Sequence, residues 1–164
     1  MSVVALTFSS VSKTFSSGGR QVQVLENMSF SIKPGRVSGL MGPDGAGKTT
    51  LMRLAAGLLV PETGEIRVLG IDALTEPLSV QSSVGYMPQR FGLYEDLSVQ
   101  ENLDLYADLQ GVPKAERLAR YTDLMQMTGL SPFTRRLAGQ LSGGMKQKLG
   151  LACTLVRSPR LLLL

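Results

Sequence analysis

Alternating apolar and polar residues in the first part of the chain predict β-strands. Val3 to Phe8 and Val22 to Ile32 alternate in this way, and the second run leads into the turn-forming pair Pro34-Gly35. Shorter apolar runs predict further strands at residues 37–41, 65–69, 84–87 and 161–164. The run at 37–41 leads directly into a glycine-rich loop.

Helical spacing of apolar residues replaces this alternation elsewhere. It predicts helices at residues 47–59, 98–110, 113–128 and 143–156. Ser98 followed three residues later by Glu101 is a capping-box pattern, which fixes the expected start of the second helix. The apolar faces are predicted to be Leu51, Leu54, Ala55 and Leu58 in the first helix, Leu103, Tyr106 and Ala107 in the second, and Leu118, Tyr121, Leu124 and Met125 in the third.

The bulk composition is that of one globular domain. The chain has 164 residues, of which 43% are hydrophobic and 18% charged, a balance typical of folded proteins. Its net charge of +4 comes from scattered residues, with Arg135-Arg136 as the longest basic run. Nucleic-acid-binding proteins usually concentrate such residues in a stripe, so no nucleic-acid partner is expected.

The single cysteine predicts no chemistry of its own. Cys153 lies in an apolar helical stretch, and the chain has no histidine to activate a thiol. A buried structural thiol in a reducing compartment is expected. No apolar run approaches the roughly 20 residues of a membrane-spanning helix, and the first eight residues lack the features of a signal peptide. A cytoplasmic location is therefore expected.

The strongest chemical signal is the loop Gly42 to Thr49, which has the pattern G-x-x-x-x-G-K-[ST]. Its glycines allow successive backbone N–H groups to face one anion, and the helix that follows adds its positive dipole end. Lys48 would reach the β- and γ-phosphates, and the Thr49 hydroxyl would bind Mg²⁺. A chance turn would match the four fixed positions in only about one chain in two hundred, so nucleotide binding is predicted.

A second glycine motif, Leu141 to Gln147, opens the last predicted helix. Ser142 is a good N-cap, and Gly143 and Gly144 leave the N–H groups of the first turn unobstructed. Alone, such a tripeptide is most often a plain loop before a helix. Together with the phosphate loop it indicates a second contact for an anion.

With both motifs present, the chain resembles the ATP-binding subunits of ABC transporters along nearly its whole length, and most of all the bacterial multidrug-export type. Gly42 to Thr49 matches Walker A, Leu141 to Met145 the signature motif, and Tyr86 to Gln89 the Q-loop. Leu161 to Leu164 looks like the start of Walker B. The resemblance implies an α/β P-loop NTPase fold with an antiparallel β subdomain and an incomplete core sheet. It implies one domain, residues 1–164, with an inserted helical subdomain at about 92–140.

The resemblance also implies site residues. Those expected to contact ATP are Phe15, Gly42, Pro43, Asp44, Gly45, Ala46, Gly47, Lys48, Thr49, Thr50, Ser142, Gly143 and Gly144. Lys48 and Gln89 are expected to act in catalysis, and Thr49 and Gln89 to bind Mg²⁺. The ring of Phe15 could stack on adenine or pack in the core, and Gln89 could instead be a plain loop residue. Asp44 stands where the family more often has Asn.

The same resemblance implies partners and an activity. The expected partners are a second ATP-binding domain, in a head-to-tail dimer or as a tandem half, and membrane subunits docked near Phe91, Leu93 and Tyr94. The protein would then lie on the inner face of the cell membrane and hydrolyse ATP to power export of drugs or lipophilic compounds. The sequence stops before the Walker B Asp and the catalytic Glu, so little hydrolysis is expected of this polypeptide alone.

Two other classes of protein remain open. A soluble ABC ATPase acting in translation or DNA repair shares both glycine motifs, although the run Met145-Lys146-Gln147 favours the export branch. A P-loop kinase or GTPase is more remote, because it would leave the signature motif and Gln89 without a purpose.

Overall fold

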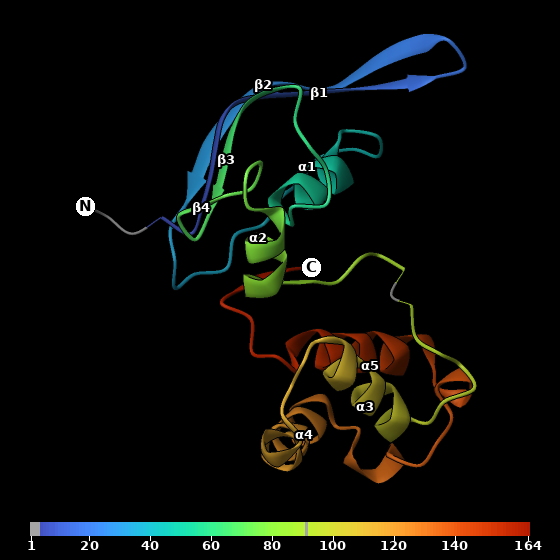
Figure 1. Cartoon of the computed structure of the whole chain (residues 1–164). Helices are drawn as coiled ribbons and strands as arrows, with labels where there is room; N and C mark the ends of the chain where they lie inside the picture. Colours follow the sequence, from blue (N-terminus) through green and yellow to red (C-terminus); the bar gives the residue numbers. More distant parts are fainter. Residues whose placement is uncertain (1–3, 91) are drawn as a thin grey trace. The chain divides into compact units, whose positions relative to one another are not determined.

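The computed structural model describes residues 4–90 and 92–164. They form two compact units, described separately below: one runs to Val84 and includes Leu163, and the other comprises Gly85–Leu162 with Leu164. Figure 1 shows the course of the chain through both. Val3, the predicted start of a strand, and Phe91, a predicted docking contact, lie outside the described residues.

The first unit is built on an antiparallel sheet of four strands in the order β2-β1-β3-β4. The strands are β1 (Leu6–Ser17), β2 (Arg20–Ile32), β3 (Thr63–Val68) and β4 (Ile71–Asp72). Phe8 and Phe30 are partners in the β1–β2 register, and their rings stack with centroids 4.8 Å apart. Beyond Ser12, β1 pairs only with β2, so the hairpin extends past β3 (Figure 1). The antiparallel subdomain expected from the sequence is confirmed.

Two short helices accompany this sheet. Helix α1 (Lys48–Ala55) buries Leu51, Leu54 and Ala55, as its pattern predicts. It ends earlier than predicted, so Leu58 lies outside it and is 49% exposed. Helix α2 (Pro77–Ser83) was not predicted; its proline stands in the first turn, where a missing N–H costs nothing.

The strand predicted at residues 37–41 is not present. This segment carries no regular structure, and Val37 and Met41 are 102% and 93% exposed. An apolar run becomes a central strand only when neighbouring strands supply ladder hydrogen bonds and helices cover both faces. No described strand pairs with this segment, so its hydrophobicity alone does not make it a strand.

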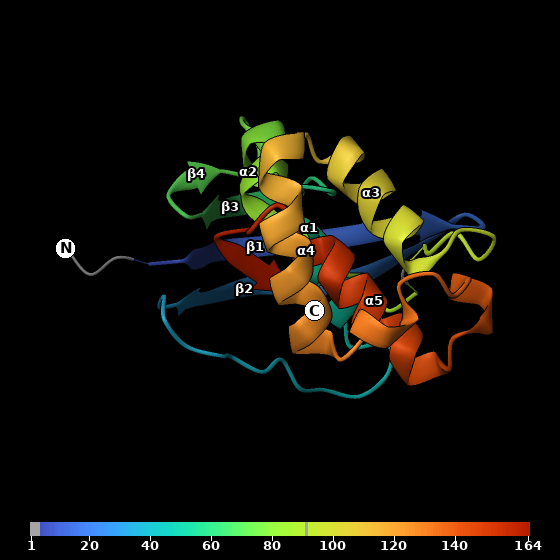
Figure 2. The ribbon, with the colours of Figure 1, turned by 90° about the horizontal axis from the view of Figure 1, so that it is seen from below.

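The second unit consists mainly of α3 (Val99–Leu109), α4 (Lys114–Thr128) and α5 (Gly143–Leu155). Helix α5 contacts both of the others (Figure 2). Their shared core comprises Val99, Leu103, Ala107, Val112, Tyr121, Met125, Leu130, Ala138, Leu141, Leu149, Ala152, Cys153 and Val156. Strands β5 (Val84–Tyr86) and β6 (Leu161–Leu163) form a separate two-stranded sheet, as expected for both segments.

The predicted capping box at the start of α3 is confirmed. The Glu101 N–H donates to the Ser98 hydroxyl at 3.2 Å, and the Ser98 N–H donates to a Glu101 carboxylate oxygen at 2.8 Å. Hydrogen bonds to the Glu101 carboxylate, first from the Ser98 side chain and then from the Ser98 N–H, stabilise its ionised form and lower the pKa of Glu101.

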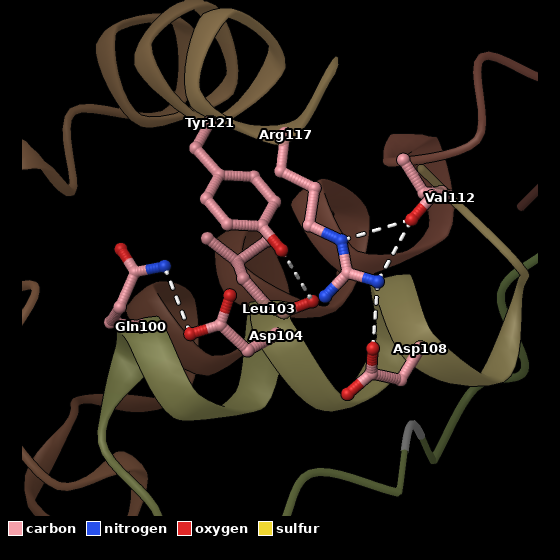
Figure 3. Close-up of polar contacts among 7 residues, drawn as sticks. All are labelled: Gln100, Leu103, Asp104, Asp108, Val112, Arg117 and Tyr121. Carbon is pink, nitrogen blue, oxygen red and sulfur yellow. Dashed lines mark hydrogen bonds and ion pairs between the residues drawn. The ribbon is translucent and has the colours of Figure 1, made fainter. Parts of the chain in front are cut away.

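One predicted core residue of α4 is wrong: Leu118 is 79% exposed. The first turn of α4 faces polar groups at the end of α3, and the neighbouring Arg117 satisfies them (Figure 3). Arg117 Nε and Nη2 donate to the Val112 carbonyl at 3.0 and 2.8 Å, and Nη2 also reaches Asp108 Oδ1 at 2.7 Å. Tyr121, one turn further on, is the first residue of α4 that reaches the core.

Cys153 is buried in the helical core, as predicted. Burial disfavours the thiolate and raises the pKa of this thiol to about 12. Within the described parts of the chain, no helix is both long enough and apolar enough to cross a bilayer.

Candidate nucleotide-binding site

The loop Gly42–Thr49 forms an exposed turn that ends at the first residues of α1. Gly45 and Gly47 have φ values of 80° and 83°, a left-handed conformation that favours glycine. The Ala46 N–H donates to the Pro43 carbonyl at 3.3 Å, which closes the turn. The backbone conformation of this loop therefore favours glycine at positions 45 and 47.

Lys48 folds back over the loop. Its Nζ donates to the carbonyls of Gly42 at 2.8 Å and Pro43 at 2.6 Å. The side chain of Lys48 is 34% exposed, and Asp44 Oδ1 lies 4.0 Å from its ammonium group. The loop thus presents one cation together with the unbonded N–H groups at the start of a helix, an arrangement suited to an anion.

Strand β2 of the β1–β2 hairpin lies close to this loop at Gly47. A Cβ built on Gly47 would lie 3.0 Å from side-chain atoms of both Val24 and Leu25 in β2. Glycine at position 47 therefore also permits close packing, which the sequence motif did not reveal. Neither Val24 nor Leu25 was singled out from the sequence, because their contact with the loop is long-range.

Phe15 lies on β1 of the same hairpin, paired with Val22. It is 38% exposed, and the Lys13 ammonium lies 5.4 Å from its ring centroid. A partly exposed ring with a cation nearby is not a core residue. This position leaves part of the ring available for a planar ligand.

The second glycine motif has the predicted cap. Ser142 Oγ accepts from the Met145 N–H at 3.3 Å, and α5 begins at Gly143. Gly143 and Gly144 are exposed, and a Cβ built on either would meet nothing within 4 Å. The start of α5 is therefore open to a molecule outside this chain.

Gln89 lies in an exposed bend after β5, in the same unit as Ser142, Gly143 and Gly144. The phosphate loop and Phe15 belong to the other unit. The structure thus groups the expected site residues into two sets.

Each unit offers one hard oxygen of the kind that magnesium binds alongside phosphate. Thr49 offers a hydroxyl oxygen at the exposed start of α1, and Gln89 offers an amide oxygen. Mg²⁺ prefers such hard oxygen ligands and usually takes only one or two from the protein, with phosphate and water supplying the rest. No group of three or more His, Cys, Asp or Glu suited to a metal occurs among the residues that the structure describes.

The chain is similar in sequence to proteins of one known family. Residues 25–164 match the family described as ABC transporter. The chain is 51% identical over its full length to the "Probable multidrug ABC transporter ATP-binding protein YbhF" of Escherichia coli (strain K12), of which it covers 28%. It is 35% identical over 98% of its length to the "Sulfate/thiosulfate import ATP-binding protein CysA" of Thermosynechococcus vestitus, of which it covers 46%. The chain therefore spans less than half of each of these two relatives.

Solved structures show the same relationship. The dimeric ATP-binding cassette MJ0796 in a post-hydrolysis state, bound to ADP and Pi, matches with a TM-score of 0.84 and 27% identity. That match covers 96% of this chain and 72% of the other. Since the family match includes the phosphate loop, the Q-loop and the signature motif, the chain belongs to the ABC transporter family as one of its ATP-binding domains.

Proposed function

We propose that this chain binds Mg²⁺-ATP through residues 42–50 and Phe15, and that the full polypeptide hydrolyses it to drive export. The observation that carries the proposal is the position of Lys48, whose ammonium lies at the loop carbonyls beside the open start of α1. A phosphate group entering the loop would replace those neutral carbonyl acceptors with a negatively charged one, so that the Lys48 ammonium gains an ion pair.

Each residue of the loop has a distinct part in this proposal. Lys48 moves from the loop carbonyls to the β- and γ-phosphates and stabilises the charge that develops there. The N–H groups from Gly47 to Thr50 bind the remaining phosphate oxygens, while Phe15 stacks on the base. Mg²⁺, when bound through Thr49 and Gln89, neutralises phosphate charge, and Gln89 also orients the attacking water.

The signature residues Ser142, Gly143 and Gly144 contact the γ-phosphate of an ATP held by a second ATP-binding domain. The support is the open start of α5, which has no occupant within the chain's own described residues, and the dimeric state of the MJ0796 cassette. In this arrangement two nucleotides are enclosed between two domains. Closure of the dimer would then be linked to ATP binding.

Export rather than import is proposed from the relative YbhF, whose name describes a multidrug transporter. The relative CysA, which is 35% identical, is named an import protein, so import is the second candidate. In either case membrane subunits would hold the protein at the inner face of the cell membrane. YbhF also favours transport over a role in translation or DNA repair.

Binding of a fluorescent ATP analogue by the full polypeptide tests the site. Lys48→Ala should weaken binding about 10- to 100-fold, because one charge-assisted contact is lost. Lys33→Ala, which removes an exposed lysine at the end of β2, should leave binding unchanged. Equal binding by Lys48→Ala and the unaltered protein would refute the site, and strong preference for a GTP analogue would indicate a GTPase instead.

Direction is tested with the full polypeptide and its membrane subunits in inside-out vesicles. Export predicts ATP-dependent accumulation of a lipophilic dye, abolished by Lys48→Ala. ATP-dependent uptake of a small solute into right-side-out vesicles, with no dye movement, would show an importer.

A further inference from the structure

The segment that follows the Q-loop and leads into α3 (residues 94–98) lies against the residues that precede α5. The Gly139 N–H donates to the Glu95 carbonyl at 2.9 Å, and the Ala138 N–H donates to the Leu97 carbonyl at 2.8 Å. These contacts join parts of the chain about forty residues apart in sequence. The segment cannot shift without moving the backbone just before the signature motif.

An ion pair also joins this segment to α5, the helix that begins within the signature motif. Lys146 Nζ lies 2.6 Å from Glu95 Oε1, with the two side chains 32% and 65% exposed. Lys146 lies near the start of α5, where its backbone N–H donates to the Ser142 carbonyl at 2.8 Å. A cation near a helix N-terminus opposes the helix dipole, so the carboxylate of Glu95 compensates an unfavourable charge at this point.

Hydrogen bonds from a buried side chain, that of Asn102, hold the conformation of residues 94–98. Asn102 is completely buried, and its amide nitrogen donates to the carbonyls of Leu97 at 3.2 Å and Ser98 at 3.0 Å. Glu95 therefore projects from a fixed loop rather than from a free one. A fixed carboxylate can set the position of its partner more effectively than a mobile one.

We propose that Glu95 is a positioning residue, which holds the first turn of α5 in the geometry that engages the γ-phosphate of the partner's ATP. The proposal rests on the function proposed above for Ser142, Gly143 and Gly144. Glu95 acts through Lys146 and the backbone before α5 and touches no nucleotide. Its contribution is to the closed dimer, not to the binding of ATP by a single domain.

The test compares four versions of the full polypeptide: Glu95→Gln, Lys146→Gln, the reversed pair Glu95→Lys with Lys146→Glu, and the unaltered protein. Each single change should lower kcat for ATP about two- to fivefold, the range expected for one exposed ion pair. Binding of the fluorescent ATP analogue to Lys48 and its loop should not change. The reversed pair should restore kcat to within about twofold of the unaltered protein, because the attraction is re-formed.

Glu116→Gln is the matched control, since it removes the carboxylate of another exposed ion pair, with Arg120 on α4. Its kcat should equal that of the unaltered protein. Unchanged kcat in both single variants, or losses that add in the reversed pair, would overturn the proposal. If the unaltered protein shows no ATPase activity that depends on Lys48, the proposed function itself fails, and the role of Glu95 fails with it.

Discussion

The buried side chain of Asn102 and the backbone of Tyr94 are joined by two hydrogen bonds, each 3.0 Å long. Asn102 Oδ1 accepts from the Tyr94 N–H, and Asn102 Nδ2 donates to the Tyr94 carbonyl. This reciprocal pair requires a side chain that is donor and acceptor at once. The amide of asparagine provides the donor and the acceptor on two separate atoms.

Replacing Asn102 should therefore destabilise the helical unit. Asn102→Ala leaves buried backbone groups without partners and should lower the free energy of unfolding by about 2 to 3 kcal/mol. Asn102→Asp should cost more, because a carboxylate cannot donate and would face the same carbonyl oxygens. Urea unfolding measures both, with the exposed Gln126→Ala on α4 as control. An Asn102→Asp protein as stable as the unaltered one would contradict the assignment.

Replacing Gly143 by alanine should leave the fold intact while lowering ATPase activity. A Cβ at this position meets nothing within 4 Å, so Gly143→Ala should keep the fold and gain up to about 1 kcal/mol of helix stability. The same methyl group would stand at the open start of α5 and should lower kcat for ATP at least about tenfold if it meets a phosphate. Thermal unfolding and ATPase assays measure the two effects, with Lys148→Ala on the same helix as control. Unchanged turnover would show that α5 does not approach the nucleotide.

Asp44 should weaken nucleotide binding. Its carboxylate lies 4.0 Å from the Lys48 ammonium and adds a negative charge to the loop that we propose binds phosphate. Asp44→Asn should tighten ATP binding about two- to fivefold, and the gain should shrink as salt is added. Isothermal titration measures the affinity, and Glu65→Gln on β3 serves as the control for loss of an exposed carboxylate. Weaker binding by Asp44→Asn would mean that the carboxylate serves the ligand rather than opposing it.

The thiol of Cys153 should make stability depend on pH in the alkaline range. Burial raises the pKa from an ordinary value of 9.0 to about 12, so the folded chain retains a proton that the unfolded chain releases. Its contribution is complete below about pH 9 and is lost as the pH rises toward 12. Unfolding of Cys153→Ala and the unaltered protein, compared at pH 8 and pH 10.5, isolates this effect. The stability difference between the two proteins should change with pH, and a constant difference would contradict it.

Sequence predicted well those features that depend on neighbouring residues. The capping box of Ser98 and Glu101, the N-cap at Ser142 and strand β2 follow from local spacing, and the structure has them. Strand β1 overlaps its predicted range, residues 3–8, only in part, since it runs from Leu6 to Ser17. The phosphate loop was visible because the chemistry of anion binding dictates residue types at fixed intervals.

Features that depend on distant residues were missed or predicted wrongly. The apolar pattern at residues 37–41 indicated a strand, but strand formation depends on partners that local pattern cannot supply. Leu118 fitted the helical stripe, yet the end of α3 presents polar groups to that turn, and Arg117 meets them. The ion pair of Glu95 and Lys146 joins residues 51 positions apart, so no local pattern could reveal it.

The pairing of β5 with β6 has a consequence for the order of folding during synthesis. The partner of residues 84–86 is synthesised only after the whole of α3, α4 and α5. The helices, held by local contacts, can form early, whereas this strand pair must wait for the chain to return. Until β6 emerges from the ribosome, β5 lacks this partner, and an unpaired strand edge favours aggregation of the nascent chain.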